Sequence, residues 1–337
     1  MRKIDIFTHI LPAAYFARMM AVAPTFADVG KRMRGVPMLF DLDLRFRVMD
    51  RFADYQQVLS LPTPPIEVLA SGGVAVDLAR TANDGMAELV ERYPERFPAF
   101  VASLPMGDPD AALTELRRAV DTLGARGIQL FSNVRGGPLA GPDTLPLFAA
   151  MADYDLPIWL HPYRGSTTSD YATEDRSQYE IWWTFGWPYE TSVAMSRIVF
   201  AGLFDRWPNL KIITHHLGAM APYFAGRVGP GWDQLGVRTS APDGAEALTR
   251  LKRRPVEYFH MFYADTALFG AYEATVCGLA FFGADRVVFA SDAPFDPEGG
   301  PMYIRETIGI IDRLPITADE RAQIYSGNAM RLLRLGS

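Results

Sequence analysis

The sequence predicts an α/β fold, a (β/α)8 barrel of the TIM type. Eight short apolar stretches are β-prone, and helical spacing separates most of them, which is the alternation of parallel α/β proteins. The chain has 337 residues, enough for a barrel of about 250 residues with additions. We therefore expect a single domain over residues 1–337, with insertions at about 13–50 and 163–187, after strands one and five.

The predicted strands are short and rich in β-branched and aromatic residues. They cover residues 3–8, 57–61, 97–104, 127–131, 157–160, 211–214, 260–264 and 286–290. Helices are predicted at 76–92, 108–124, 146–154, 188–204, 302–313 and 317–335. A doubly wound sheet would normally show a glycine-rich turn after its first strand, whereas here His9-Ile10-Leu11-Pro12 follows. A closed barrel is therefore favoured over an open sheet.

Composition excludes several classes of partner. The net charge of −6 offers no basic field for nucleic acid and no polybasic patch for an anionic membrane. No apolar run reaches the roughly 18 residues of a membrane-spanning helix. Cys277 is the only cysteine, so an intrachain disulfide is impossible, which fits a reducing compartment. We expect a cytoplasmic protein that binds neither nucleic acid nor membrane.

Four polar residues lie at the carboxyl ends of predicted strands. His9, His161 and His215 follow strands one, five and six, and Asp292 follows strand eight. In a barrel these ends meet at one rim, where the chemistry of such folds is located. Imidazole and carboxylate suit Zn²⁺, Mn²⁺ or Fe²⁺ better than Ca²⁺ or Mg²⁺, and three ligands leave a position for substrate. We expect His9, His161 and Asp292 to bind the metal, with Asp292 also serving catalysis, and His215 to act as the acid/base.

The remaining two histidines are weaker candidates. His216 neighbours His215, and adjacent residues of a strand point in opposite directions, so it is expected to pack behind the site. His260 begins predicted strand seven, the wrong end for catalysis, and is expected to be structural.

The insertion at 163–187 is rich in aromatic residues that could cover a flat ring. Arg164 and Trp187 are its expected substrate contacts, because an arginine can pair with a carboxylate. Phe7, two residues before His9, is the third expected contact. Core or subunit packing is the competing explanation for these aromatics.

The chain resembles the amidohydrolase superfamily, in the branch that contains aminocarboxymuconate-semialdehyde decarboxylase and γ-resorcylate decarboxylase. The similar segments run through the whole chain: residues 4–12, 160–162, 186–191, 214–219, 226–227, 262–265 and 290–295. The resemblance implies a (β/α)8 barrel, one divalent metal ion, and a homodimer or higher oligomer. It also implies His161 and Asp292 as metal ligands and His215 as the acid/base.

One position departs from this pattern. The family places a histidine or a glutamate two residues before the residue that corresponds to His9, and here that position is Phe7. Phenylalanine cannot bind a metal, so two histidines and one aspartate remain. Zinc is the expected ion, with manganese as the alternative. A metal-free enzyme that uses His9, His161 and His215 as acids and bases stays open.

Three functions fit these residues. The first is non-oxidative decarboxylation of a small aromatic or unsaturated carboxylic acid, with the metal binding the carboxylate and His215 handling the proton. The alternative is hydrolysis of a C–C, ester or thioester bond, for example in a β-ketoacyl thioester, by a metal-activated water. The third is a non-catalytic binding protein on a decayed barrel, for which Phe7 is the only support. The resemblance favours the decarboxylase.

Overall fold

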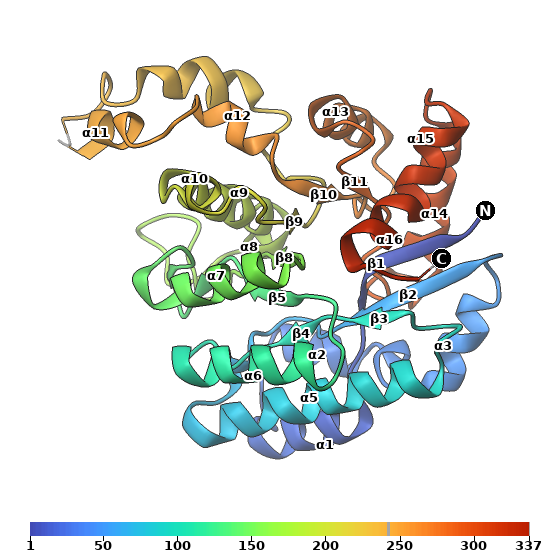
Figure 1. The fold of residues 1–337 in the computed structure, drawn as a ribbon. Coiled ribbons are helices and arrows are strands. Elements are labelled where there is room, and N and C mark those ends of the chain that lie inside the picture. The colour runs from blue at the N-terminus through green and yellow to red at the C-terminus, as the bar shows by residue number, and fades with distance from the viewer. Residues whose placement is uncertain (241–242, 337) are drawn as a thin grey trace.

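The computed structural model describes residues 1–240 and 243–336, and it contains a parallel barrel (Figure 1). Hydrogen bonds connect the strands in the orders β1–β2–β3 and β4–β5–β8–β9–β10–β11. Only Val101 separates β3 from β4, so these two form one interrupted strand. The strands are β1 (Lys3–His9), β2 (Tyr55–Ser60), β3 (Ala99–Phe100), β4 (Ala102–Ser103), β5 (Ile128–Phe131), β8 (Ile158–His161), β9 (Ile212–Thr214), β10 (Tyr263–Asp265) and β11 (Val287–Val288).

The last strand region returns to the first and closes the barrel. The amide of Ile6 donates to the carbonyl of Phe289 at 3.0 Å, and the amide of Asp292 donates to that of Phe7 at 3.1 Å. A bridge between Thr8 and Ala293 extends this pairing. The predicted barrel is therefore confirmed, and its closure brings the carboxyl ends of all strands to one rim.

Helices alternate with the strands and lie around them (Figure 1). The main ones are α5 (Gly72–Arg92), α6 (Pro109–Asp121), α7 (Leu145–Tyr154), α9 (Gly186–Phe200), α12 (Pro255–Phe259), α13 (Tyr272–Phe282) and α14 (Pro301–Arg313). Asp108 caps the N-terminus of α6, because its carboxylate accepts from the amide of Ala111 at 3.0 Å. Within the described residues, no helix is both long and apolar enough to cross a membrane.

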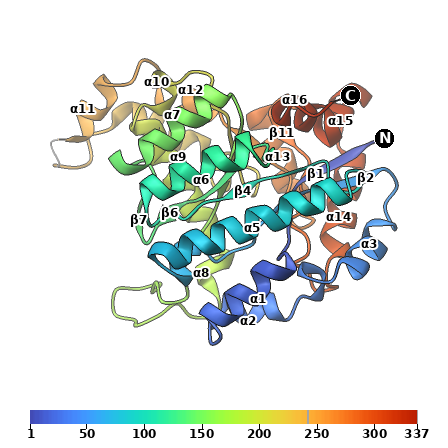
Figure 2. The ribbon, with the colours of Figure 1, turned by 60° about the horizontal axis from the view of Figure 1, so that its bottom comes forward.

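Both predicted insertions lie near each other at one end of the barrel (Figure 2). The first contains α1 (Ala13–Val22), α2 (Val29–Arg34), η1 (Pro37–Leu39) and α3 (Leu42–Met49), and the second contains α8 (Ile181–Thr184). They touch through Asp28, whose carboxylate accepts a hydrogen bond from the Ser166 hydroxyl and lies 3.9 Å from the Arg176 guanidinium.

Several predicted boundaries are wrong. His260 does not begin a strand but follows α12, and β10 begins only at Tyr263. The apolar run before it suits a buried helix end as well as a strand, and periodicity cannot separate the two. His260 stacks on Phe281 and is exposed, which agrees with a structural role. The eighth strand shortens to β11, and the predicted helix 317–335 divides into α15 (Ala318–Ala322), η5 (Gln323–Gly327) and α16 (Asn328–Leu333).

The remaining elements are short connections between barrel units. They are α4 (Ile66–Leu69), the hairpin of β6 (Asn133–Val134) and β7 (Gly137–Pro138), η2 (Pro142–Thr144), α10 (Leu203–Arg206), η3 (Arg227–Gly231), η4 (Trp232–Gln234) and α11 (Asp243–Thr249).

Candidate metal centre

A bulge in β1 directs two side chains of the first strand into the barrel mouth. The pairing with β2 shifts between Asp5 and Thr8, so one strand has an extra residue there. Ile6 and Phe7 consequently belong to the same interior cluster although they are adjacent in sequence. Beyond this register shift, the side chains of Phe7 and His9 lie on the same, inward face of β1, so both reach the site.

Two histidines turn Nε2 toward the centre of the rim. The Nδ1 of His9 lies 3.1 Å from the carbonyl of Leu61, and the Nδ1 of His161 lies 2.7 Å from that of Pro162. A carbonyl only accepts, so each Nδ1 donates to its carbonyl, and Nε2 is the ring nitrogen left to face the site. A metal-ligating histidine commonly has such a backbone partner behind it.

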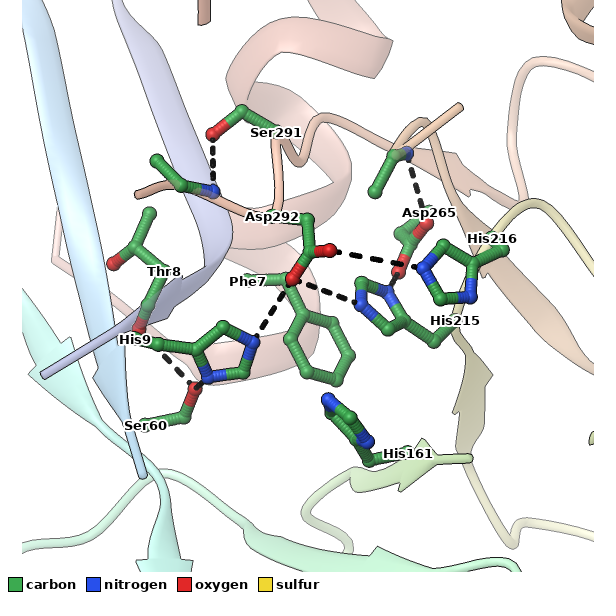
Figure 3. Close-up of polar contacts among 12 residues, drawn as sticks. Phe7, Thr8, His9, Ser60, His161, His215, His216, Asp265, Ser291 and Asp292 are labelled. Atoms are coloured by element: carbon green, nitrogen blue, oxygen red, sulfur yellow. Dashed lines mark hydrogen bonds and ion pairs between the residues drawn. The ribbon is translucent and has the colours of Figure 1, made fainter. Parts of the chain in front are cut away.

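The carboxylate of Asp292 lies among three imidazoles (Figure 3). Its Oδ1 is 3.0 Å from the Nε2 of His9 and 3.3 Å from the Nε2 of His215. Its Oδ2 is 3.7 Å from the Nε2 of His216. Asp292 has a φ of 64°, a left-handed conformation that is strained for a residue with a side chain and is common at functional sites.

His215 is held from behind by Asp265, a residue to which the sequence analysis gave no role. The Nδ1 of His215 donates to the Asp265 carboxylate, which also accepts from the amide of Ala267 at 2.9 Å. The ring of His215 stacks on Phe7 with 3.9 Å between centroids and 17° between planes. Asp265 ends β10, so its position at a strand end was the available signal.

The expectation that His216 points away from the site is wrong. β9 ends at Thr214, so strand alternation does not reach His216, and its left-handed φ of 56° accompanies a ring that stacks on that of His215, with 3.9 Å between centroids. His216 is buried, and neither ring nitrogen has a hydrogen-bond partner among the described residues. Two adjacent imidazoles therefore face Asp292.

Burial and neighbouring charge set the protonation of the site. Burial, together with His215 and His9, holds the pKa of His161 well below its usual value, so this imidazole is neutral. Burial raises the pKa of Asp292, but the surrounding histidines outweigh it and hold that pKa well below its usual value. Burial lowers the pKa of His215, whereas Asp265 and Asp292 raise it to about 9.

The donor set fits a divalent ion. The candidate ligand atoms of His9, His161 and His215 all lie within 4.8 Å of one another, and His215, His216 and Asp292 form a second such group. The Nε2 of His9 lies 3.0 Å from the Oδ1 of Asp292, so these two candidate ligand atoms are close enough to share a proton or a cation. Neutral imidazoles and an ionised carboxylate are the forms that bind metals.

The expected substrate contacts lie in different surroundings. Phe7 and Trp187 both border the histidines, and the Trp187 ring centroid is 5.8 Å from that of His161. The Arg164 guanidinium is instead 3.3 Å from the Glu190 carboxylate and 3.2 Å from the carbonyl of Ser169.

Known proteins are similar to this chain over most of its length. The family model described as Amidohydrolase matches residues 4–335. A γ-resorcylate decarboxylase of Polaromonas sp. is 33% identical over 306 residues, covering 87% of each chain. The 2-amino-3-carboxymuconate-6-semialdehyde decarboxylase of Dictyostelium discoideum is 29% identical, covering 99% of this chain and 92% of its own.

One similar solved structure contains a metal ion. The dihydroxybenzoic acid decarboxylase of Polaromonas sp., with bound manganese and the inhibitor 2-nitroresorcinol, has a TM-score of 0.80 and 30% identity. The match covers 99% of this chain and 97% of that one. With a family model that spans nearly its whole length, the chain belongs to the amidohydrolase family.

Proposed function

We propose that this protein is a metal-dependent, non-oxidative decarboxylase of a small aromatic carboxylic acid. The observation that carries the proposal is the convergence of two imidazole Nε2 atoms and one carboxylate at the barrel rim. The relatives with about 30% identity are decarboxylases, which supports this reaction over hydrolysis.

In this proposal His9, His161 and Asp292 hold one divalent ion. When bound, the ion would act as a Lewis acid on the substrate's carboxylate and a neighbouring oxygen. The backbone carbonyls behind His9 and His161 fix the ring orientations and keep Nε2 available. Zinc and manganese both suit this donor set, and the manganese of the Polaromonas structure supports the second.

His215 is the proposed acid/base. Loss of CO₂ from an aromatic ring requires a proton at the carbon that carried the carboxylate. The Nε2 of His215 is buried and faces the site, where its contact is the Asp292 carboxylate at 3.3 Å, so we propose that it delivers that proton. Asp265 holds Nδ1 and stabilises the imidazolium from which the proton leaves.

Aromatic side chains would define the substrate's plane. We propose that Phe7 and Trp187 border the ring, since both lie against the histidines. Arg164 would pair with a substrate carboxylate only by exchanging its contact with Glu190. The small-molecule partner is therefore a flat carboxylate.

The reaction is tested with the protein loaded with Mn²⁺ or Zn²⁺ in separate samples. We expect CO₂ release from 2,6-dihydroxybenzoate or another ortho-hydroxylated benzoate, measured by a coupled CO₂ assay and by chromatography of the phenol. Benzoate is the matched control, because it lacks the second oxygen for the metal. Release of free thiol from a β-ketoacyl thioester, without CO₂ from any aromatic acid, would favour the hydrolase instead.

Phe7→His should strengthen metal binding, because it adds a donor on the inward face of β1 beside His9. We expect the Kd for Mn²⁺ to fall by about tenfold, equivalent to roughly 1.4 kcal/mol. Phe7→Leu is the control, since it changes the same position without adding a donor. Equal Mn²⁺ affinity in the two variants would show that position 7 lies too far from the ion to bind it.

The proposed homodimer or higher oligomer is supported by an exposed apolar stripe along α9. Phe185, Tyr189 and Val193 are 75%, 53% and 37% exposed, and their four-residue spacing places them on one helical face. We expect Tyr189→Glu to lower the mass measured by light scattering toward that of one chain. Tyr171→Glu, an exposed tyrosine outside the stripe, should not. A single-chain mass for the unaltered protein at micromolar concentration would contradict the oligomer.

A further inference from the structure

Arg45, in helix α3 of the first insertion, is a fully buried cation beside the proposed metal centre. Its Nη1 donates to the side-chain oxygen of Gln57 at 2.7 Å, and its Nη2 donates to the carbonyl of His9. The carbonyl of Met38 accepts from Nη2 at 3.1 Å and from Nε at 3.3 Å. Buried charges persist in proteins when they are fully bonded and have a counter-charge.

A series of hydrogen bonds connects the Arg45 guanidinium to the carboxyl group of Asp5. The amide nitrogen of Gln57 donates to the Tyr55 hydroxyl at 3.1 Å, and that hydroxyl donates to the Asp5 carboxylate at 2.6 Å. Arg45, Gln57, Tyr55 and Asp5 are all buried. Every link donates in the same direction, from the Arg45 guanidinium to the Asp5 carboxyl group, so each bond polarises the next.

Asp5 accepts from a full set of donors. Besides Tyr55, the hydroxyl and amide of Ser291 and the amide of Phe7 point at its two oxygens. Burial raises the pKa of Asp5 to about 7 although these hydrogen bonds act to lower it. An arginine guanidinium stays charged at neutral pH.

The two end residues of this hydrogen-bond series, Arg45 and Asp5, bond to the backbone at or next to the proposed ligands. Arg45 holds the carbonyl of His9 itself, and Asp5 holds Ser291, the residue before Asp292. Asp292 needs this support, because its left-handed φ of 64° is unfavourable for aspartate in isolation. The carbonyl and the amide held in this way belong to β1 and to the segment after β11, the two edges at which the barrel closes.

We propose that Arg45 and Asp5 are a positioning pair, coupled through Gln57 and Tyr55, that fixes the backbones of His9 and Asp292 in the geometry that binds the metal ion. The inference rests on the proposed function, because it concerns the same centre. Neither residue touches the ion or the substrate in this proposal. Their role is to pre-form the site, so that binding does not have to order it.

The test measures Mn²⁺ binding directly, from the EPR signal of free Mn²⁺ during titration of the full-length protein. Tyr55→Phe removes only the hydroxyl group that connects Gln57 to Asp5 in the hydrogen-bond series. We expect its Kd for Mn²⁺ to rise by about 10- to 100-fold, the range for lost partners of metal ligands. Arg45→Met should have a similar effect, and the double variant should not exceed the larger single effect by much, because both break the same path.

Two controls separate positioning from general stability. Tyr15→Phe alters another buried tyrosine, which takes no part in the hydrogen bonds between Arg45 and Asp5. Arg47→Met alters an exposed arginine of the same helix as Arg45. Both should bind Mn²⁺ as the unaltered protein does. Thermal unfolding of each variant shows whether the protein is folded at the temperature of the titration. If the Arg45→Met variant does not fold, the Mn²⁺ affinity of the Tyr55→Phe variant still tests the positioning pair.

A folded Tyr55→Phe variant with unchanged Mn²⁺ affinity would overturn the positioning pair and leave the proposed function intact. An unaltered protein that binds Mn²⁺ but decarboxylates nothing would overturn the proposed reaction alone. Failure of the unaltered protein to bind Mn²⁺ or Zn²⁺ would overturn the metal centre and, with it, the positioning pair.

Discussion

Asp292→Ala is expected to abolish metal binding and activity together. The carboxylate is the only anionic group among the proposed ligands, and its oxygens lie 3.0 Å from His9 and 3.3 Å from His215. Loss of a partner behind a ligand typically costs 10- to 100-fold in metal affinity, so loss of the ligand itself should raise the Kd for Mn²⁺ by more than about 100-fold. Titration calorimetry with Mn²⁺ and the decarboxylation assay measure the two effects.

Glu298→Ala is the control for this variant. It removes an exposed carboxylate from the same segment, where Glu298 pairs with Arg305 at 2.9 Å. We expect its metal content and rate to match those of the unaltered protein. His161→Ala should reproduce the loss seen with Asp292→Ala, because it removes a neutral donor from the same proposed ligand set. Full metal content in either ligand variant would show that the ion, if bound, lies elsewhere.

His215→Ala is expected to keep the metal ion but to lower kcat by about 10²- to 10⁴-fold, the range for a removed acid/base. The ring is not among the proposed ligands, yet its Nε2 faces the site and its Nδ1 is bonded to Asp265. We therefore expect the metal content, measured by elemental analysis, to be unchanged while the turnover number falls.

His216→Ala is the matched comparison, because the two rings are stacked and both face Asp292. If His215 is the acid/base, the His216 variant should lose much less rate. The opposite order, with His215→Ala nearly active and His216→Ala inactive, would transfer the role to His216. Asp265→Asn should lower kcat as well, because the amide cannot stabilise the imidazolium as a carboxylate does.

The barrel and the convergence of His9, His161, His215 and Asp292 could be predicted from the sequence for one reason. Both depend on periodicity and on the rule that strand ends share a rim, which holds whatever the details of the loops. The positions of the strands along the chain were predicted correctly, although β10 and β11 are shorter than expected.

The orientation of single side chains could not be predicted, because local backbone irregularities determine it. The bulge in β1 turns Phe7 and His9 inward, and the left-handed backbone of His216 brings a second imidazole to Asp292. The role of Arg45 depends on four hydrogen bonds made in three dimensions, whereas in the sequence it is one of several arginines of the insertion.

The phenylalanine at position 7 also changes the electrostatic balance of the active centre. With an acid there, the ligand set would carry two negative charges and would neutralise a divalent cation. With Phe7 stacked on His215, Asp292 is the only acidic member of the proposed set, so a doubly charged ion would leave an excess of one positive charge. In a cavity of low dielectric such an excess attracts a monoanion strongly, and a benzoate would bring the centre to neutrality on entering.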